Sequence, residues 1–146
     1  MQNETQTPIP YGRSAAQNTA MNERVILHIL SRSDWDLAKG LGDYRPPSLT
    51  AEGFIHCSTI AQVIDTANLF YRGQGDLLVL RIDRRKLTAP LKFEAPANSG
   101  DARPEALFPH LYGPLNLDAV IDAIELPSDA DGSFRLPAAL GGSLPD

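Results

Sequence analysis

The three histidines of this chain, His28, His56 and His110, are the side chains whose type and placement suggest chemistry. Imidazole titrates near neutral pH, so it can donate or accept a proton in a reaction. Each histidine lies in a segment rich in apolar residues. We predict that His56 and His110 serve as acid or base and that His28 binds a ligand. The alternative is that each is a core histidine with satisfied hydrogen bonds.

The segment 52–59 places His56 between an expected strand and an expected helix. Successive residues of a strand point to opposite faces, so Phe54, His56 and Ser58 share one face. Thr59 is predicted to cap the following helix, whose first backbone N–H groups favour a polar or anionic ligand. We therefore expect Phe54 and Ser58 to bind a ligand beside His56.

The segment 108–115 holds His110 and Tyr112 between Pro109 and Pro114. Proline fixes its own backbone angle φ, so this segment is stiff. If it is extended, His110 and Tyr112 lie on the same face. Preorganised polar groups of this kind favour a binding or catalytic site.

The spacing of the residues gives less support to a metal site, a nucleophilic cysteine or serine, or a phosphate-binding loop. Three imidazoles are a common zinc set, but the chain lacks His-x-His and His-Glu-x-x-His motifs, so we assign no metal ligands. Cys57 and His56 are neighbours on a strand and point to opposite faces, which places Cys57 in the core rather than in a nucleophilic pair. Ser58 lacks the Gly-x-Ser-x-Gly context of a nucleophile elbow. Phosphate-binding glycine motifs are also missing from the sequence.

Apolar runs predict the elements that position these side chains. Strands are expected at 25–30, 54–58, 77–82, 91–94 and at the end of 117–126, and helices at 33–41, capped by Ser33, and after Thr59. The second helix should bury a stripe that ends at Phe70 and Tyr71, and Tyr71 is a candidate ligand-binding residue. The proline-containing segment 44–49 is predicted to be a loop, from which Arg45 can point at a ligand.

The composition predicts one α+β domain over 23–126, with a flexible N-terminal tail at 1–22 and a C-terminal tail at 127–146. A net charge of -5 argues against a nucleic-acid partner. The sequence has no run of about 20 apolar residues that could span a bilayer. The single cysteine and the absence of a signal-peptide pattern favour the cytoplasm.

Two blocks of the sequence resemble a small bacterial family, the domain of unknown function 952. They are Glu52-Gly53-Phe54-Ile55-His56-Cys57-Ser58 and Phe108-Pro109-His110-Leu111-Tyr112-Gly113-Pro114-Leu115. The resemblance extends over about 24–126. This family is similar in presumed fold to ADP-ribosyltransferase-like proteins. The resemblance thus implies a curved, split, mostly antiparallel sheet with two or three helices that holds NAD in a cleft.

The resemblance also implies roles for particular residues. His28 corresponds to a histidine that holds the NAD ribose, and Tyr71 to a tyrosine that stacks on nicotinamide. The place of the usual catalytic glutamate is taken by Pro109-His110-Leu111-Tyr112, and an imidazole stabilises positive charge less well than a carboxylate. We therefore expect a nucleotide-like small molecule, with NAD as the candidate cofactor, in a histidine-lined cleft. A noncatalytic binding module and a histidine-dependent hydrolase, with or without a metal, stay open as alternatives.

Overall fold

The computed structural model describes residues 24–96 and 106–141. The predicted tail at 1–22 lies outside these ranges. The strands are β1 (Val25–Ser31), β2 (Asp43–Tyr44), β3 (Ile55–His56), β4 (Leu77–Asp83), β5 (Leu91–Glu94), β6 (Phe108–Leu111), β7 (Leu115–Asn116) and β8 (Val120–Leu126). The helices are α3 (Arg32–Leu41), α4 (Pro47–Glu52), α5 (Val63–Phe70) and α6 (Ala138–Gly141), with short 3-10 turns at η1 (Arg84–Lys86) and η3 (Leu117–Ala119).

The largest apolar runs form the central sheet, in which β4 lies between β1 and β8. Both pairings are antiparallel, with Leu27 opposite Arg81 and Val79 opposite Ile124. All residues of β4 are buried. A run that is apolar on both faces must be covered on both sides, and this confirms the central position expected for 77–82.

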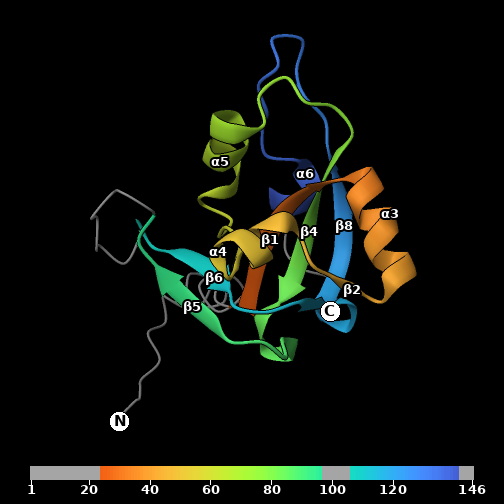
Figure 1. Cartoon of the computed structure of the whole chain (residues 1–146). Helices are drawn as coiled ribbons and strands as arrows, with labels where there is room; N and C mark the ends of the chain where they lie inside the picture. Colours follow the sequence, from red (N-terminus) through yellow and green to blue (C-terminus); the bar gives the residue numbers. More distant parts are fainter. Residues whose placement is uncertain (1–23, 97–105, 142–146) are drawn as a thin grey trace, which may run out of the picture.

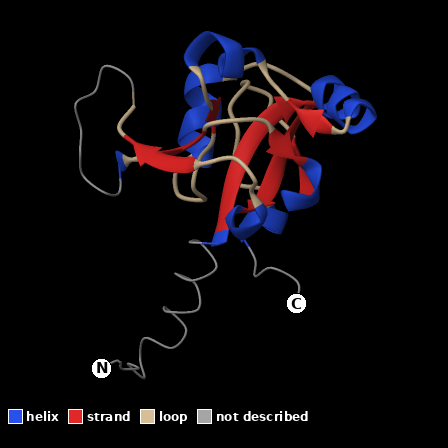
Figure 2. Ribbon diagram, turned by 60° about the horizontal axis from the view of Figure 1, so that its bottom comes forward, coloured by secondary structure: helices blue, strands red, loops and turns tan. Residues whose placement is uncertain are grey.

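A second antiparallel sheet has the order β3-β6-β5, and β2 pairs with β7 in a separate two-stranded ladder. The second sheet lies beside the central one rather than continuing it (Figures 1 and 2). The two sheets are joined where Leu27 of β1 and Ser58 exchange backbone hydrogen bonds of 2.8 and 2.7 Å. The protein is thus a small α+β domain built on antiparallel sheets.

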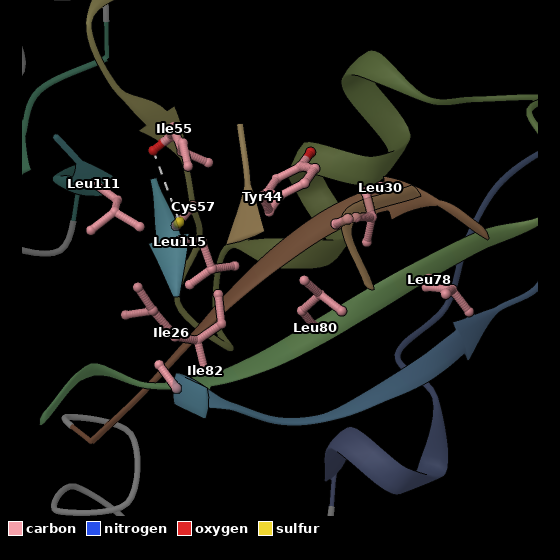
Figure 3. Packing of buried hydrophobic residues seen from close by; sticks show 12 residues of the cluster. Ile26, Leu30, Tyr44, Ile55, Cys57, Leu78, Leu80, Ile82, Leu111 and Leu115 are labelled. Atoms are coloured by element: carbon pink, nitrogen blue, oxygen red, sulfur yellow. Dashed lines mark hydrogen bonds between the residues drawn. The ribbon is translucent and has the colours of Figure 1, made fainter. Parts of the chain in front are cut away.

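The central sheet separates two apolar cores because its strand residues alternate between faces. The first core lies between the sheet and the shorter strands, where Ile26, Leu80, Tyr44, Ile55 and Leu115 pack together (Figure 3). Helices α5 and α6 cover the opposite face and form the second core. Its buried members are Leu27, Ile29, Val63, Ala67, Leu77, Val79, Leu126, Phe134 and Leu140.

Two predictions for the helices were wrong. The segment 44–49 is not a loop, because Pro47 begins α4, where a missing N–H costs no intrahelical bond. Helix α3 is capped by Ser31 rather than Ser33, since the Ser31 hydroxyl accepts a hydrogen bond of 3.1 Å from the backbone N–H of Asp34. With α4 and α6, the described residues contain more helices than the two or three expected.

Helix α5 also differs in detail from its prediction. Thr59 is not its N-cap, because Gln62 holds that position without a side-chain capping hydrogen bond. The Gln62 amide oxygen instead accepts a hydrogen bond of 2.9 Å from the backbone N–H of Thr59. The helix proper begins only at Val63. The predicted stripe is buried at Val63 and Ala67, but Phe70 at its end is 68% exposed. Phe70 therefore does not belong to the buried stripe, whereas Tyr71, directly after the helix, packs against the second core.

The segment after Leu126, predicted to be a tail, contributes to the second core as far as Leu140. Phe134 and Leu140 are 2% and 5% exposed. Asn68 of α5 binds the backbone of Phe134 in both directions, donating to its carbonyl at 3.2 Å and accepting from its N–H at 2.7 Å. The packed domain therefore extends beyond the boundary predicted at 126.

Replacing Asn68 with alanine should lower the free energy of unfolding by about 1 to 2 kcal/mol, because two backbone groups of Phe134 lose their partner. Urea unfolding of Asn68→Ala measures this change. Asp65→Ala, on the exposed side of the same helix, is the control and should change stability by less than about 0.5 kcal/mol. Equal stability of the two variants would show that Asn68 does not hold the C-terminal segment.

No helix in the described ranges is both long enough and apolar enough to span a bilayer.

Candidate functional site

The β3-β6-β5 sheet brings most of the candidate side chains together. In its register, His110 of β6 lies between His56 of β3 and Lys92 of β5. Directly opposed residues of neighbouring strands point to the same face. We call this surface the histidine face, and it consists of Phe54, His56, Lys92, Glu94, His110 and Tyr112.

Aromatic rings form the centre of the histidine face. The Phe54 ring stacks on His110 with the ring centroids 4.1 Å apart and the planes 20° from parallel. His56 meets the same phenyl ring edge-on at 4.9 Å, and Tyr112 lies 5.2 Å from it. The two imidazole centroids are 5.5 Å apart. Phe54 therefore contacts both imidazoles.

Glu94 anchors one side of this cluster. Its Oε1 atom accepts hydrogen bonds from Nδ1 of His110 at 2.8 Å and from the Tyr112 hydroxyl at 2.5 Å. The Tyr112 hydroxyl, and to a smaller degree His110, hold the pKa of Glu94 below its ordinary value. The same hydrogen bond raises the pKa of Tyr112, because the hydroxyl can donate it only while it keeps its proton. His110 and Tyr112 thus lie on one face, as the proline-bounded segment predicts.

His56 contacts a different carboxylate, that of Glu52. Its Nε2 atom lies 3.1 Å from both carboxylate oxygens of Glu52, which ends α4 four residues earlier. The His56 and Glu52 side chains are 53% and 47% exposed, so this pair contributes at most about 1 kcal/mol to stability. Its main effect is to orient an imidazole that is open to solvent.

His28 is buried beneath this surface. Its Nδ1 lies 2.6 Å from the backbone carbonyl oxygen of His56, and its Nε2 lies 2.8 Å from the Tyr44 hydroxyl. A carbonyl oxygen only accepts, so Nδ1 donates and Nε2 accepts from Tyr44. Burial lowers the pKa of His28 to about 4, and this outweighs the raising effect of the His56 carbonyl. His28 is therefore neutral at neutral pH.

The remaining predicted residues have partners away from the histidine face. The Ser58 hydroxyl is buried and donates to the Thr66 hydroxyl at 3.4 Å. Arg45 is exposed and forms an ion pair of 3.0 Å with Asp43. Tyr71 packs against the second core, where burial raises its pKa. The structure does not bring these three side chains to His56 and His110.

Cys57 is buried in the first core, as predicted from its neighbour relation with His56. Burial raises the pKa of its thiol to about 12. The thiolate, which is the nucleophilic form, is therefore not available at neutral pH.

Comparison with known proteins identifies the family. A family model described as a protein of unknown function, DUF952, matches residues 29–123. The chain belongs to the DUF952 family. No curated protein matches this DUF952 chain.

Solved structures of one bacterial protein are similar to this DUF952 chain. The crystal structure of protein CC0527 from Caulobacter crescentus is 38% identical, has a TM-score of 0.70, and the match covers 80% of this chain and 98% of that one. The solution NMR structure of CC0527 is 40% identical with a TM-score of 0.61, and covers 75% and 90% of the two chains. Both were structural genomics targets.

The histidines of the DUF952 domain do not form a three-ligand metal set. Both ring nitrogens of His28 are engaged in hydrogen bonds. Within 24–96 and 106–141, no group of three histidine, cysteine, aspartate or glutamate side chains is arranged to hold a metal ion. The geometry instead offers two imidazoles that are each held by a carboxylate.

Glu52, Glu94 and Tyr44 are site residues that the sequence analysis missed. Alternation within 91–94 places Lys92 and Glu94 on one face, but only the sheet order shows that this strand lies beside β6. For Glu52, the sequence does offer an indication of the contact, since Glu52 precedes His56 by four residues. That spacing points to a contact only if the chain bends as it does at Gly53, where φ is 90°.

Proposed function

We propose that this DUF952 protein binds a nucleotide-like small molecule, NAD or ADP-ribose, on the histidine face, and that His56 and His110 act there as acid and base. One observation carries the proposal: two imidazoles with centroids 5.5 Å apart are each hydrogen-bonded to a separate carboxylate. The His56 side chain is half exposed, whereas the His110 side chain is buried. Different surroundings suit opposite roles in proton transfer.

Further support concerns the ligand class. Lys92, whose ammonium group lies 4.8 Å from the Tyr112 ring centroid, adds positive charge that favours phosphate groups. The two separate antiparallel sheets are compatible with the split sheet that the resemblance to ADP-ribosyltransferase-like proteins implies. Transfer of ADP-ribose is left out of the proposal, because His110 occupies the place of the usual glutamate.

The ligand contacts are assigned to the histidine face rather than to His28 and Tyr71. His28 uses both ring nitrogens within the protein, so it has no hydrogen-bonding capacity left for a ribose. Tyr71 packs against the second core. Phe54 and Tyr112 are the aromatic side chains that lie beside the two imidazoles.

Isothermal titration calorimetry with NAD, ADP-ribose and nicotinamide tests the proposal. The wild-type protein should bind NAD or ADP-ribose, and His56→Ala should weaken that binding at least tenfold, about 1.4 kcal/mol. Because His56 is exposed, its removal should leave the fold intact. Asp65→Asn on α5 is the control, and its affinity should equal that of the wild type.

Chromatography of the same NAD incubations tests the catalytic half of the proposal. Slow hydrolysis of NAD by the wild type is the expected result: water takes up the ADP-ribosyl group as nicotinamide leaves, and the rate falls in His56→Ala and His110→Ala. Binding without any product would instead identify a noncatalytic binding module. No binding of either nucleotide would overturn the proposal.

A further inference from the structure

Glu94 is the one side chain of the histidine face that contacts both His110 and Tyr112 by hydrogen bonds. The pKa of Glu94 is held below its ordinary value, so the group is an ionised carboxylate at neutral pH. An ionised carboxylate has no proton to donate. In the contact of 2.8 Å, the proton must therefore reside on Nδ1 of His110.

We infer that Glu94 is a positioning residue for His110, which it holds in the Nδ1–H tautomer so that Nε2 is the atom that accepts a proton from the ligand. When Nε2 takes that proton, His110 becomes a cation, and the adjacent carboxylate stabilises it. Glu94 itself stays ionised throughout. The tautomer follows from these contacts, whereas the role of His110 as a base and the identity of the ligand rest on the proposed function.

The surroundings of His110 keep its ring in this orientation. The ring stacks on Phe54 at 4.1 Å, and the side chain is only 7% exposed, so rotation out of the cluster would break packing. The second hydrogen bond, from Tyr112, ends on the same carboxylate oxygen and holds Glu94 in place. In water a histidine prefers the Nε2–H tautomer, so the opposite preference requires an acceptor fixed at Nδ1.

Long-range proton–nitrogen NMR of protein labelled with nitrogen-15 in histidine reads the tautomer of each ring directly. At neutral pH, His110 in the wild type should carry its proton on Nδ1. In Glu94→Ala it should shift towards the Nε2–H form. Lys92→Ala is the matched control, since Lys92 shares the strand and the face of Glu94 but makes no hydrogen bond with His110 in the described structure, and it should retain Nδ1–H.

His28 serves as an internal reference in the same spectra. Its contacts with the His56 carbonyl and Tyr44 require Nδ1–H. An unchanged His28 signal in Glu94→Ala shows that the fold is intact. Any change at His110 is then local.

The affinity for NAD separates this inference from the proposed function. Glu94→Ala should weaken binding at least tenfold, whereas Asp65→Asn, on α5 and outside the histidine face, should bind NAD as the wild type does. A tautomer change without NAD binding by the wild type would support the positioning role and overturn the proposed function. An Nε2–H signal for His110 in the wild type, or the same tautomer in Glu94→Ala as in the wild type, would overturn the inference even if NAD binds.

Discussion

Replacing His28 with alanine should lower the free energy of unfolding by about 3 to 4 kcal/mol. The side chain is 7% exposed, so its removal creates a cavity. It also leaves the His56 carbonyl and the Tyr44 hydroxyl without the partners they now have at 2.6 and 2.8 Å. Urea unfolding at neutral pH, followed by circular dichroism, measures the change.

His56→Ala is the matched control for this experiment. It removes the same side chain from an exposed position, where the pair with Glu52 contributes little, so the loss should be less than about 1 kcal/mol. A similar stability for the two variants would contradict the structural role assigned to His28.

Stability should also fall by about 3 kcal/mol between pH 6.5 and pH 4 through His28 alone. Burial lowers its pKa in the folded state to about 4, whereas the unfolded chain has the ordinary value of 6.5. Between these values the unfolded state binds a proton that the folded state excludes. Acidification therefore favours unfolding in this window, and the contribution is fully present above it. Urea unfolding at a series of pH values gives the change in the free energy of unfolding with pH.

His28→Gln isolates this contribution from that of the carboxylates, which also titrate at low pH. Glutamine carries an amide donor for the His56 carbonyl and a carbonyl acceptor for the Tyr44 hydroxyl, but it has no titration in this range. The variant should have a shallower slope between pH 6.5 and pH 4. An unchanged slope would show that folding does not lower the pKa of His28.

Much of the fold follows from local sequence patterns. The apolar runs at 25–30 and 77–82 predict the two long strands because a short run of consecutive apolar residues is typical of a strand buried on both faces. The strand expected at the end of 117–126 is also confirmed. Local rules failed at Pro47, where proline begins a helix rather than preventing one, and at Phe134, whose burial depends on a partner in α5.

The candidate site could be predicted only in part. Strand alternation places Phe54 and His56 together, and separately His110 and Tyr112. It does not show that the segment with His56 pairs with the segment with His110. Nor does it show that the strand at 91–94 pairs with the other edge of the His110 strand. Ser58 illustrates the limit, since alternation assigns it to the face of His56 but its hydroxyl contacts Thr66.

The sequence by itself determined the α+β class, the long strands, the buried Cys57 and the membership in DUF952, because these depend on local periodicity and on short motifs. Only the tertiary structure decided which histidines meet, with His28 enclosed and His56 and His110 on one face. It also brought Glu94 to His110. The physical reason is that pairing between strands depends on contacts between distant segments, and no local pattern encodes the order of strands in a sheet.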